Sequence, residues 1–333
     1  MTVVRIARHC NERCVFCNIS SEDGYNQYYE TLEDVQRYID ERKPRKKEII
    51  EISGGEPTLN PKLPEIVRLF KKNGYRMAID TNAVRFADYN YTRTVTREGL
   101  SDAFVSLHAA NAELSESITG CKDTFDKTIK GIDNLIANNI DVTINFVWFS
   151  QNKEHLPDFA RFLRSRFGGK VELHLSVIAP NFTDRVEDFI FPISEGVPVL
   201  LETIEICEKI GLNFKVADIC GIPLCFIKGH ENIYVDPLLL FVPPVRGRIR
   251  DKVKGLQCRD CVHFNDCAGV VKEYAMVFGT DELVPVTTLS TKMRLLYSAA
   301  RSPITLHALR FMAQRLKNNA IRETRFRLNS FLS

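Results

Sequence analysis

Three cysteines, Cys10, Cys14 and Cys17, stand close together in the stretch RHCNERCVFC near the N-terminus. Cysteine thiolates are the usual ligands of iron–sulfur clusters, and three of them can hold three corners of an iron–sulfur cube. The fourth iron would then lack a protein ligand, which is a defect in a structural zinc site but an open position for a substrate in a catalytic cluster. The spacing therefore indicates a cluster with one open corner, with zinc binding as the alternative.

A glycine-rich segment, ISGGEPT, follows the second predicted strand at residues 52–58. Gly54 and Gly55 would let backbone carbonyls approach a ligand closely, because glycine carries no side chain. Glu56 would supply negative charge for an ammonium group. The alternative is an ordinary strand-to-helix turn, with Pro57 near the start of the helix.

Together the two segments resemble the signature of the radical S-adenosylmethionine superfamily. The resemblance rests on CxxxCxxC with the aromatic Phe16 directly before the last cysteine, and on GGEP at the end of the second strand. It covers about residues 1–215 and implies a partial (βα)6 barrel. It also implies a [4Fe–4S] cluster on the three cysteines, with S-adenosylmethionine bound to the open iron through its amino and carboxylate groups. The reduced cluster of these enzymes splits the sulfonium and gives a 5′-deoxyadenosyl radical.

The same resemblance implies a set of contacts to S-adenosylmethionine at the ends of the strands. The set comprises Phe16, Gly54, Gly55, Glu56, Pro57, Asp80, Thr81, Asn82, Ser106, His108, Asn145 and the backbone around Val177. For His108, an ordinary buried histidine with satisfied hydrogen bonds is an equal alternative. Cys121 is expected to be packed in the interior, with donation of a hydrogen atom to a product radical as the alternative.

Five further cysteines cluster in the last third of the chain, and CxxC followed by another cysteine is a strong metal signal. They are Cys220 and Cys225 in CGIPLC, and Cys258, Cys261 and Cys267 in CRDCVHFNDC. The segment is similar to the auxiliary-cluster regions of radical enzymes called SPASM and twitch domains. It departs from the SPASM pattern at Val271, where a fourth cysteine would stand.

Five thiols cannot fill two cubes, so we expect one auxiliary iron–sulfur cluster, of the [4Fe–4S] type. The expected ligands are Cys225, Cys258, Cys261 and Cys267. Cys220 is the first substitute, and Cys207 is a weaker one because a lone cysteine is usually a small buried hydrophobe. Structural zinc is the alternative metal. His263, in the same loop, is expected to be a surface histidine rather than a ligand.

Apolar strand-like runs alternate with amphipathic helix-length segments through the first two thirds of the chain. The predicted strands are residues 3–7, 49–53, 76–81, 103–108, 142–148 and 171–178, with a short one at 213–216. The predicted helices are residues 31–42, 62–73, 86–98, 124–138, 154–167 and 194–210. Six strand–helix repeats imply an α/β fold with a parallel sheet, either open or partly closed into a barrel. Ligands of both architectures bind where the strands end, and the triple-cysteine loop lies at such an end.

Length and charge divide the chain into three predicted parts. At 333 residues, 44% hydrophobic and 26% charged, it can bury a large core. We expect the barrel in residues 1–215, a small cysteine-rich domain folded around metal in residues 216–289, and a basic helical tail in residues 290–333. The tail has nine Lys and Arg against Glu323 alone, whereas the whole chain carries only +3.

The composition also indicates in which cellular compartment the protein is located. The sequence has no run of about 18 apolar residues that could span a bilayer, and its first predicted strand leaves no room for a secretory signal. Ten cysteines in such a chain indicate metal or catalytic thiols rather than disulfides. We therefore expect a cytoplasmic protein without a membrane partner, reduced by a donor such as flavodoxin or ferredoxin.

Three functions remain in competition. The favoured one is a radical enzyme that abstracts hydrogen from a peptide or small molecule, to oxidise, cross-link or epimerise it, with the auxiliary cluster assisting. The second is a radical enzyme that modifies RNA or another macromolecule attracted by the basic tail. Nucleic acid is the weaker partner, because the tail lacks the interleaved aromatic residues that stack on bases. The third is a non-catalytic zinc protein.

Overall fold

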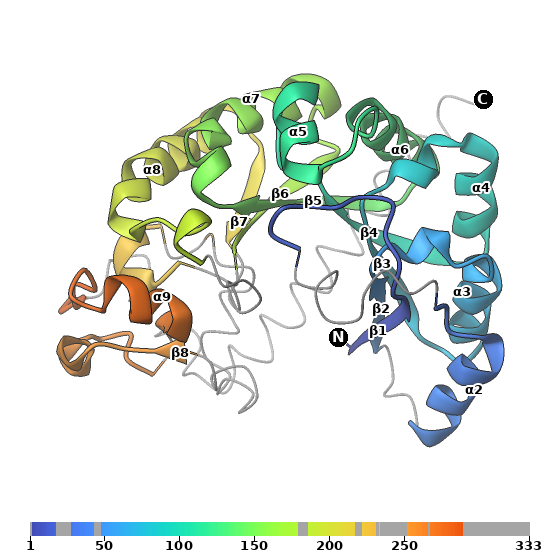
Figure 1. Ribbon diagram of the computed structural model, residues 1–333, viewed down its shortest axis with the longest axis horizontal. Helices are drawn as coiled ribbons and strands as arrows, with labels where there is room; N and C mark the ends of the chain where they lie inside the picture. The colour runs from blue at the N-terminus through green and yellow to red at the C-terminus, as the bar shows by residue number, and fades with distance from the viewer. Residues whose placement is uncertain are drawn as a thin grey trace, which may run out of the picture.

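A computed structural model describes residues 2–17, 28–42, 48–178, 186–216, 222–230, 233, 252–265 and 267–288. In this part of the chain seven strands form one sheet, and each strand pairs in parallel with the next one along the sequence. The strands are β1 Thr2–Ala7, β2 Ile49–Gly54, β3 Arg76–Thr81, β4 Leu100–Ser106, β5 Asp141–Trp148, β6 Val171–Val177 and β7 Asn213–Val216. Because every connection advances by one strand in the same direction, the sheet curves into an open, partial barrel (Figure 1).

Helices line the outer side of this curved sheet (Figure 1). They are α2 Leu32–Glu41, α3 Leu63–Lys72, α4 Tyr89–Arg97, α5 Ala112–Thr119, α6 Phe125–Ala137, α7 Leu156–Phe167 and α8 Ile193–Ile210. Short 3-10 turns lie at η1 Pro57–Leu59, η2 Val84–Ala87, η3 Ser150–His155, η4 Val186–Asp188, η5 Leu224–Ile227 and η8 Leu256–Asp260. A smaller unit follows, with a two-stranded antiparallel sheet of β8 Lys252–Val253 and β9 Val270–Val271, and helix α9 Lys272–Phe278.

The two faces of the sheet differ in polarity, as β5 illustrates. Ile144, Phe146 and Trp148 are fully buried, and the ring of Phe146 lies 4.7 Å from that of Phe159 in α7. The intervening residues of β5, including Asn145, are only half-buried. Since side chains alternate between the faces of a strand, the apolar set faces the helices and the polar set lines the concave side.

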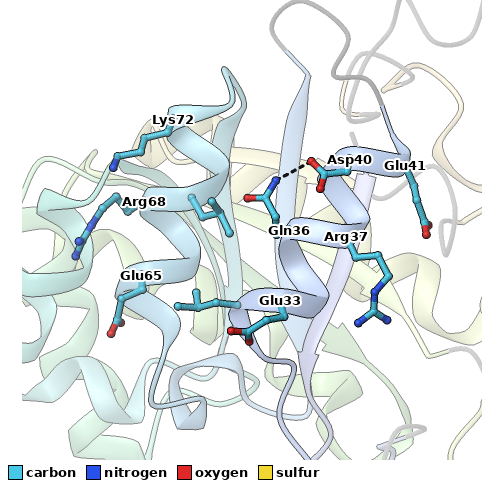
Figure 2. A pocket seen from close by; sticks show the side chains of 10 residues that line it. Glu33, Gln36, Arg37, Asp40, Glu41, Glu65, Arg68 and Lys72 are labelled. Atoms are coloured by element: carbon cyan, nitrogen blue, oxygen red, sulfur yellow. Dashed lines mark hydrogen bonds between the residues drawn. The ribbon is translucent and has the colours of Figure 1, made fainter.

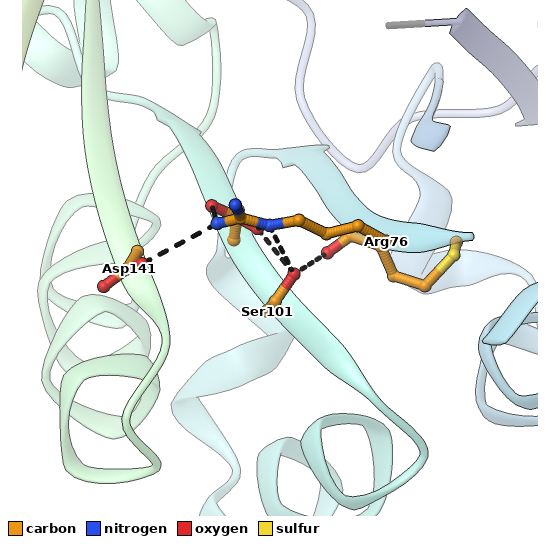
Figure 3. A network of polar contacts seen from close by, with 5 residues as sticks. Arg76, Ser101 and Asp141 are labelled. Atoms are coloured by element: carbon orange, nitrogen blue, oxygen red, sulfur yellow. Dashed lines mark hydrogen bonds and ion pairs between the residues drawn. The ribbon is translucent and has the colours of Figure 1, made fainter. Parts of the chain in front are cut away.

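A polar network ties three strands together at their N-terminal ends (Figure 3). The Arg76 guanidinium donates to both carboxylate oxygens of Asp102, at 2.8 and 2.5 Å, and lies 3.9 Å from the carboxylate of Asp141. The Ser101 hydroxyl donates to the carbonyl of Met77 at 2.8 Å. This network lies at the opposite ends of the strands from the triple-cysteine loop, so it fixes strand register without entering the candidate site.

The predicted α/β fold with a parallel sheet is confirmed. The short strand predicted at residues 213–216 is also confirmed: it pairs with β6 and adds a seventh strand to the six strand–helix repeats. The single helix expected at residues 86–98 is divided into two elements at Asp88. The 3-10 turn η2 ends at this residue, and its carboxylate caps the start of α4. Helix α5 was not predicted, although Asn111 caps its start and Gly120 ends it with a positive φ.

Two expectations fall outside the described residues, namely Cys220 as a metal ligand and the helical tail at residues 290–333. The boundaries of the three predicted parts stay predictions. Among the helices of the described ranges, none is both long enough and apolar enough to cross a membrane.

Candidate functional site

The triple-cysteine loop, residues 8–17, leaves β1 and lies against the end of α5. The backbone N–H of Arg13 donates to the carbonyl of Thr119 at 2.8 Å, and that of Val15 donates to the carbonyl of Ile118 at 2.9 Å. The thiol of Cys121 donates to the carbonyl of Asn11 at 3.4 Å. Backbone pairing with a segment about a hundred residues away therefore holds the loop in place at the C-terminal ends of the strands.

Three half-buried thiols share one region of this loop. Burial raises the pKa of Cys10 to about 12, and the nearby carboxylates of Glu56 and Glu12 and the thiol of Cys17 add to the effect. Burial likewise raises the pKa of Cys14, again with Glu12 and the other two thiols adding. Thiolates are costly in such surroundings unless a positively charged group offsets them. The iron core of a cluster is such a group, so the donor set fits an iron–sulfur cluster.

The two glycines at the end of β2 pack against the triple-cysteine loop. A Cβ on Gly55 would lie 2.3 Å from the carbonyl oxygen of His9, and one on Gly54 would lie 2.1 Å from that of Ala7. The N–H of Gly55 donates to Ala7 O, and that of Glu56 donates to His9 O, both at 2.8 Å. The glycines were expected to allow a ligand to approach. In the structure they allow the loop itself to approach β2.

Glu56 is almost completely buried, and its carboxylate is surrounded by donors from the protein. One oxygen accepts from the Thr58 N–H at 3.0 Å and from the hydroxyls of Thr58 and Thr81 at 2.6 and 2.7 Å. The other accepts from the Asn82 N–H at 2.8 Å. These contacts join the end of β2 to the end of β3. The sequence had instead suggested that the Glu56 carboxylate would contact an ammonium group of a ligand. Burial raises the pKa of Glu56, while the hydrogen bonds act in the opposite direction.

The polar residues at the end of β3 also meet this site. The Asn82 side chain donates to the side-chain oxygen of Asn11 in the triple-cysteine loop at 2.8 Å. Asp80 accepts from the Ser53 hydroxyl at 3.0 Å, and burial raises the pKa of its carboxyl. The structure thus brings Thr81 and Asn82 together with Glu56, and Asn82 with the triple-cysteine loop, whereas Asp80 contacts Ser53.

His108 packs behind the triple-cysteine loop. The ring of Phe16 lies edge-on to the rings of His108 and Phe149, at 5.1 and 5.2 Å. His108 Nδ1 accepts from the Val147 N–H at 3.1 Å, and burial lowers the pKa of the imidazole to about 3. The geometry supports the alternative of a satisfied, neutral buried histidine over a contact to a charged ligand.

Further polar residues stand along the concave face beyond His108. Asn145 accepts from the Ser176 hydroxyl at 2.8 Å, and Ser106 lies opposite Asn145 in the register of β4 and β5. All three are half-buried. Val177, at the end of β6, lines a small apolar pocket with Trp148 and Tyr274.

The structure brings four of the later cysteines together in the small unit. Cys225, Cys258, Cys261 and Cys267 line one enclosed pocket. Burial raises the pKa of Cys225 to about 12, and the charges of the other three thiols add to the rise. Cys207 does not line this pocket and is buried in α8. As in the first site, half-buried thiols that cluster together fit a metal centre.

His263 was expected at the surface, and that expectation was wrong. The residue is completely buried and lines the same pocket as the four cysteines. The sequence interpretation failed because a histidine in a short loop is ordinarily at least partly exposed, whereas this loop closes around its own cysteines.

Two features of the surroundings were not predicted from the sequence. Glu12, between Cys10 and Cys14, is buried instead of solvated. An open groove of about 800 Å³ runs between α2 and α3 on the outer side of the barrel, lined mainly by charged side chains (Figure 2). The groove lies away from the strand ends, so it is not part of the candidate site.

Comparisons with known proteins agree with this geometry. Residues 4–163 match the family model of the radical SAM superfamily. A probable GTP 3′,8-cyclase of Saccharolobus islandicus is 34% identical over 179 residues, which are 53% of this chain and 56% of the relative. An Fe-coproporphyrin III synthase of Methanosarcina barkeri is 29% identical over 157 residues, which are 47% of this chain and 39% of that one. The chain thus spans little more than half the length of the first of these relatives, and less of the second.

Solved structures share the fold at low sequence identity. Streptococcus suis SuiB bound to its precursor peptide SuiA superposes with a TM-score of 0.59 at 15% identity, covering 86% of this chain and 74% of SuiB. The protein anSMEcpe, with bound S-adenosylmethionine and a peptide, superposes with a TM-score of 0.54 at 13% identity, covering 65% and 62%. The family match, the parallel sheet and the three cysteines at its edge together identify residues 4–163 as a radical SAM domain.

Proposed function

We propose that the protein reductively cleaves S-adenosylmethionine and uses the resulting radical to abstract hydrogen from a peptide or a small molecule. The observation that carries the proposal is the gathering of Cys10, Cys14 and Cys17 on one loop at the C-terminal edge of the parallel sheet. These three thiols would hold three corners of a [4Fe–4S] cluster and leave the fourth iron for S-adenosylmethionine. When bound, the cluster would supply the electron that breaks the sulfonium and yields a 5′-deoxyadenosyl radical.

The chain's own residues support this chemistry by shaping the site. Glu56 holds the ends of β2 and β3 together beside the cysteines, and Asn82 ties β3 to the triple-cysteine loop. The carboxylates of Glu12 and Glu56 give the site negative charge, which suits a cationic cofactor that carries an ammonium and a sulfonium group. Phe16 and His108 exclude water behind the loop, and exclusion of water protects a radical from side reactions.

The concave face of the barrel favours a polar substrate. Half-buried polar side chains stand along it on three strands, namely Asp80 on β3, Asn145 on β5 and Ser176 on β6. Glu51, lower on β2, has a pKa raised to about 7 by burial and by the charge of Asp80. A carboxyl group with such a pKa can hold or release a proton at neutral pH. This face can therefore make hydrogen bonds to a peptide backbone or to a polar small molecule.

The second centre is proposed to be one auxiliary iron–sulfur cluster on Cys225, Cys258, Cys261 and Cys267. Reduction potentials of protein-bound clusters span roughly −700 to +450 mV, so such a centre could accept an electron from a substrate radical. The alternatives are substrate binding and structural support. Buried His263 and the backbone N–H of Val286, 3.4 Å from the Cys261 sulfur, would surround this cluster.

Peptide and small-molecule substrates are both consistent with the named relatives. SuiB binds a precursor peptide, whereas the cyclase and the synthase are named for a nucleotide and a porphyrin. We further propose a cytoplasmic location and a flavodoxin or ferredoxin as electron donor. Modification of RNA remains the second candidate, which rests only on the basic charge of residues 290–333.

The test is anaerobic reconstitution with iron and sulfide, followed by counting of both elements and assay of 5′-deoxyadenosine. We expect two clusters per chain in the wild type. Cys14→Ala should abolish cleavage of S-adenosylmethionine, and Cys261→Ala should lose half of the iron but keep uncoupled cleavage. Cys207→Ala, in the core of α8, is the control and should keep both clusters. A zinc-containing protein without iron would refute the proposal, and product formation by Cys261→Ala at the wild-type rate would remove the redox role of the second centre.

A further inference from the structure

Lys254 lines the enclosed pocket of the small unit together with four cysteines. These cysteines are the ligands proposed for the auxiliary cluster, namely Cys225, Cys258, Cys261 and Cys267. Among the described residues that line the pocket there is no Asp, Glu or Arg. In this part of the chain Lys254 therefore carries the one permanent positive charge beside the four thiols.

The ammonium group of Lys254 is held by the loop that carries two of these cysteines. Its Nζ donates to the carbonyl of Phe264 and lies 4.4 Å from the centre of the Phe264 ring, whose face attracts a cation. Phe264 stands between Cys261 and Cys267, and its N–H donates to the carbonyl of Cys261 at 3.0 Å. Neither contact of the ammonium group uses a sulfur atom, so both persist when the thiols bind iron.

The positive charge of Lys254 is not neutralised by a neighbouring carboxylate. Within the described ranges, no ion pair joins Lys254 to an Asp or Glu side chain. Burial raises the pKa of the Cys267 thiol, whereas the charge of Lys254 acts in the opposite direction. The ammonium group thus favours the anionic form of one of the proposed ligands.

A fixed cation beside an iron–sulfur cluster favours its reduced form. Four thiolates around a [4Fe–4S] core leave a net negative charge, which grows by one when the core takes up an electron. The attraction of a nearby ammonium group grows with that charge, so it stabilises the reduced cluster more than the oxidised one. Net charge and hydrogen bonds to the sulfurs are among the factors that set the potential of a cluster.

We propose that Lys254 raises the reduction potential of the auxiliary cluster and so makes this cluster a better acceptor for one electron. The N–H of Val286, which donates to the Cys261 sulfur at 3.4 Å, acts in the same direction. The inference rests on the proposed function, since it requires the four thiols to hold a cluster. It goes beyond that function, because the cysteine pattern gives Lys254 no role.

The test is a potentiometric titration of the reconstituted full-length protein, followed by EPR. The signal of the reduced protein that S-adenosylmethionine leaves unchanged reports the auxiliary cluster. Lys254→Gln removes the charge but keeps an N–H donor for the Phe264 carbonyl, and Lys254→Arg keeps both. Lys272→Met, at the exposed start of α9 in the same unit, is the matched control, because it changes the net charge by the same amount.

We expect Lys254→Gln to lower the equilibrium constant for one-electron reduction about tenfold, which lowers the midpoint potential by about 59 mV. Lys254→Arg and Lys272→Met should titrate like the wild type. Iron is counted in each variant, because a lysine with a purely structural role would change the iron content and not the potential. If Lys254→Gln does not fold, Lys254→Met should show the same fall.

Two kinds of result would count against different statements. A wild-type potential in the uncharged variants of Lys254, or an equal fall in Lys254→Arg or Lys272→Met, would overturn the role of Lys254. Absence from the wild type of a second signal, unaffected by S-adenosylmethionine, would instead refute the auxiliary cluster of the proposed function.

Discussion

The carboxylate of Glu56, at the end of β2, accepts a hydrogen bond from the hydroxyl of Thr81, at the end of β3, at a distance of 2.7 Å. This contact and the bond from the Asn82 N–H join two strands directly beside the triple-cysteine loop. Glu56 is thus part of the scaffold that presents the site, and its substitution should affect folding as well as chemistry.

Replacement of Glu56 by glutamine should lower the free energy of unfolding by about 1–3 kcal/mol. The amide of glutamine has only one acceptor oxygen, so it leaves either the Asn82 N–H or the donors from Thr58 and Thr81 facing an NH2 group. Urea unfolding measures the change. Glu98→Gln, which alters the surface ion pair with Arg68, is the control and should cost less than about 1 kcal/mol. Equal stability of the two variants would contradict the scaffold role.

Replacement of Gly55 by alanine should displace the triple-cysteine loop from β2. The added Cβ would lie 2.3 Å from the carbonyl oxygen of His9, which belongs to the backbone and cannot rotate away. We expect a loss of about 1–3 kcal/mol in unfolding free energy and a lower iron content after reconstitution. In Gly74→Ala the new Cβ meets nothing within 4 Å, although its positive φ should cost about 1 kcal/mol. Wild-type iron content in Gly55→Ala would show that the loop tolerates displacement.

The buried imidazole of His108 should make the protein less stable in mild acid. Its pKa is lowered to about 3 by burial, whereas an unfolded histidine titrates near 6.5. Between these values the unfolded chain binds the extra proton, so stability rises with pH through this window and falls on acidification. The contribution of His108 between pH 7 and pH 5 should be about 2 kcal/mol.

Urea unfolding of wild type and His108→Gln at pH 5, 6 and 7 tests this dependence. The glutamine oxygen can still accept from the Val147 N–H, so the variant should keep the hydrogen bond and show a shallower dependence on pH. His155→Gln, at an exposed position, should follow the wild type. Parallel curves for wild type and His108→Gln would show that His108 does not titrate in this range.

Much of the barrel could be predicted because strand and helix periods are local properties of the sequence. The alternation in β5 and the helical spacing in α7 are visible in ten to fifteen consecutive residues. The place of Cys10, Cys14 and Cys17 at a strand end followed from the same pattern, since all parallel strands end at one edge. Helix α5 was missed because its eight residues give a weak period, although Asn111 and Gly120 marked its ends.

The surroundings of the cysteines could not be predicted from spacing. Contacts such as the Cys121 thiol to Asn11 O join residues 110 positions apart, and Glu12 is buried although it stands between two cysteines in a loop. A charged residue in a loop is ordinarily solvated, and a histidine in a short loop is ordinarily at least partly exposed. Glu12 and His263 depart from these averages because the loops that carry them fold around their own thiols.

The last prediction concerns the attachment of the cysteine-rich unit to the barrel. Helix α8 begins without a side-chain cap of its own, and the N–H of Ile193 donates instead to the hydroxyl of Tyr274 in α9 at 2.7 Å. The next N–H, that of Ser194, donates to the carboxylate of Glu282 at 3.2 Å. Tyr274→Phe should therefore lower stability by about 1 kcal/mol and increase hydrogen exchange in the first turn of α8.

Tyr89→Phe, at a half-exposed position of α4, is the matched control and should leave this exchange unchanged. Because α9 follows β9 directly in the unit that holds Cys258, Cys261 and Cys267, the same bond helps to fix those thiols relative to the ends of β5 and β6. Unchanged exchange in Tyr274→Phe would mean that apolar packing around Trp148 and Val270 holds the unit without the hydrogen bond. In that case Trp148→Ala, rather than Tyr274→Phe, should detach the cysteine-rich unit from the barrel.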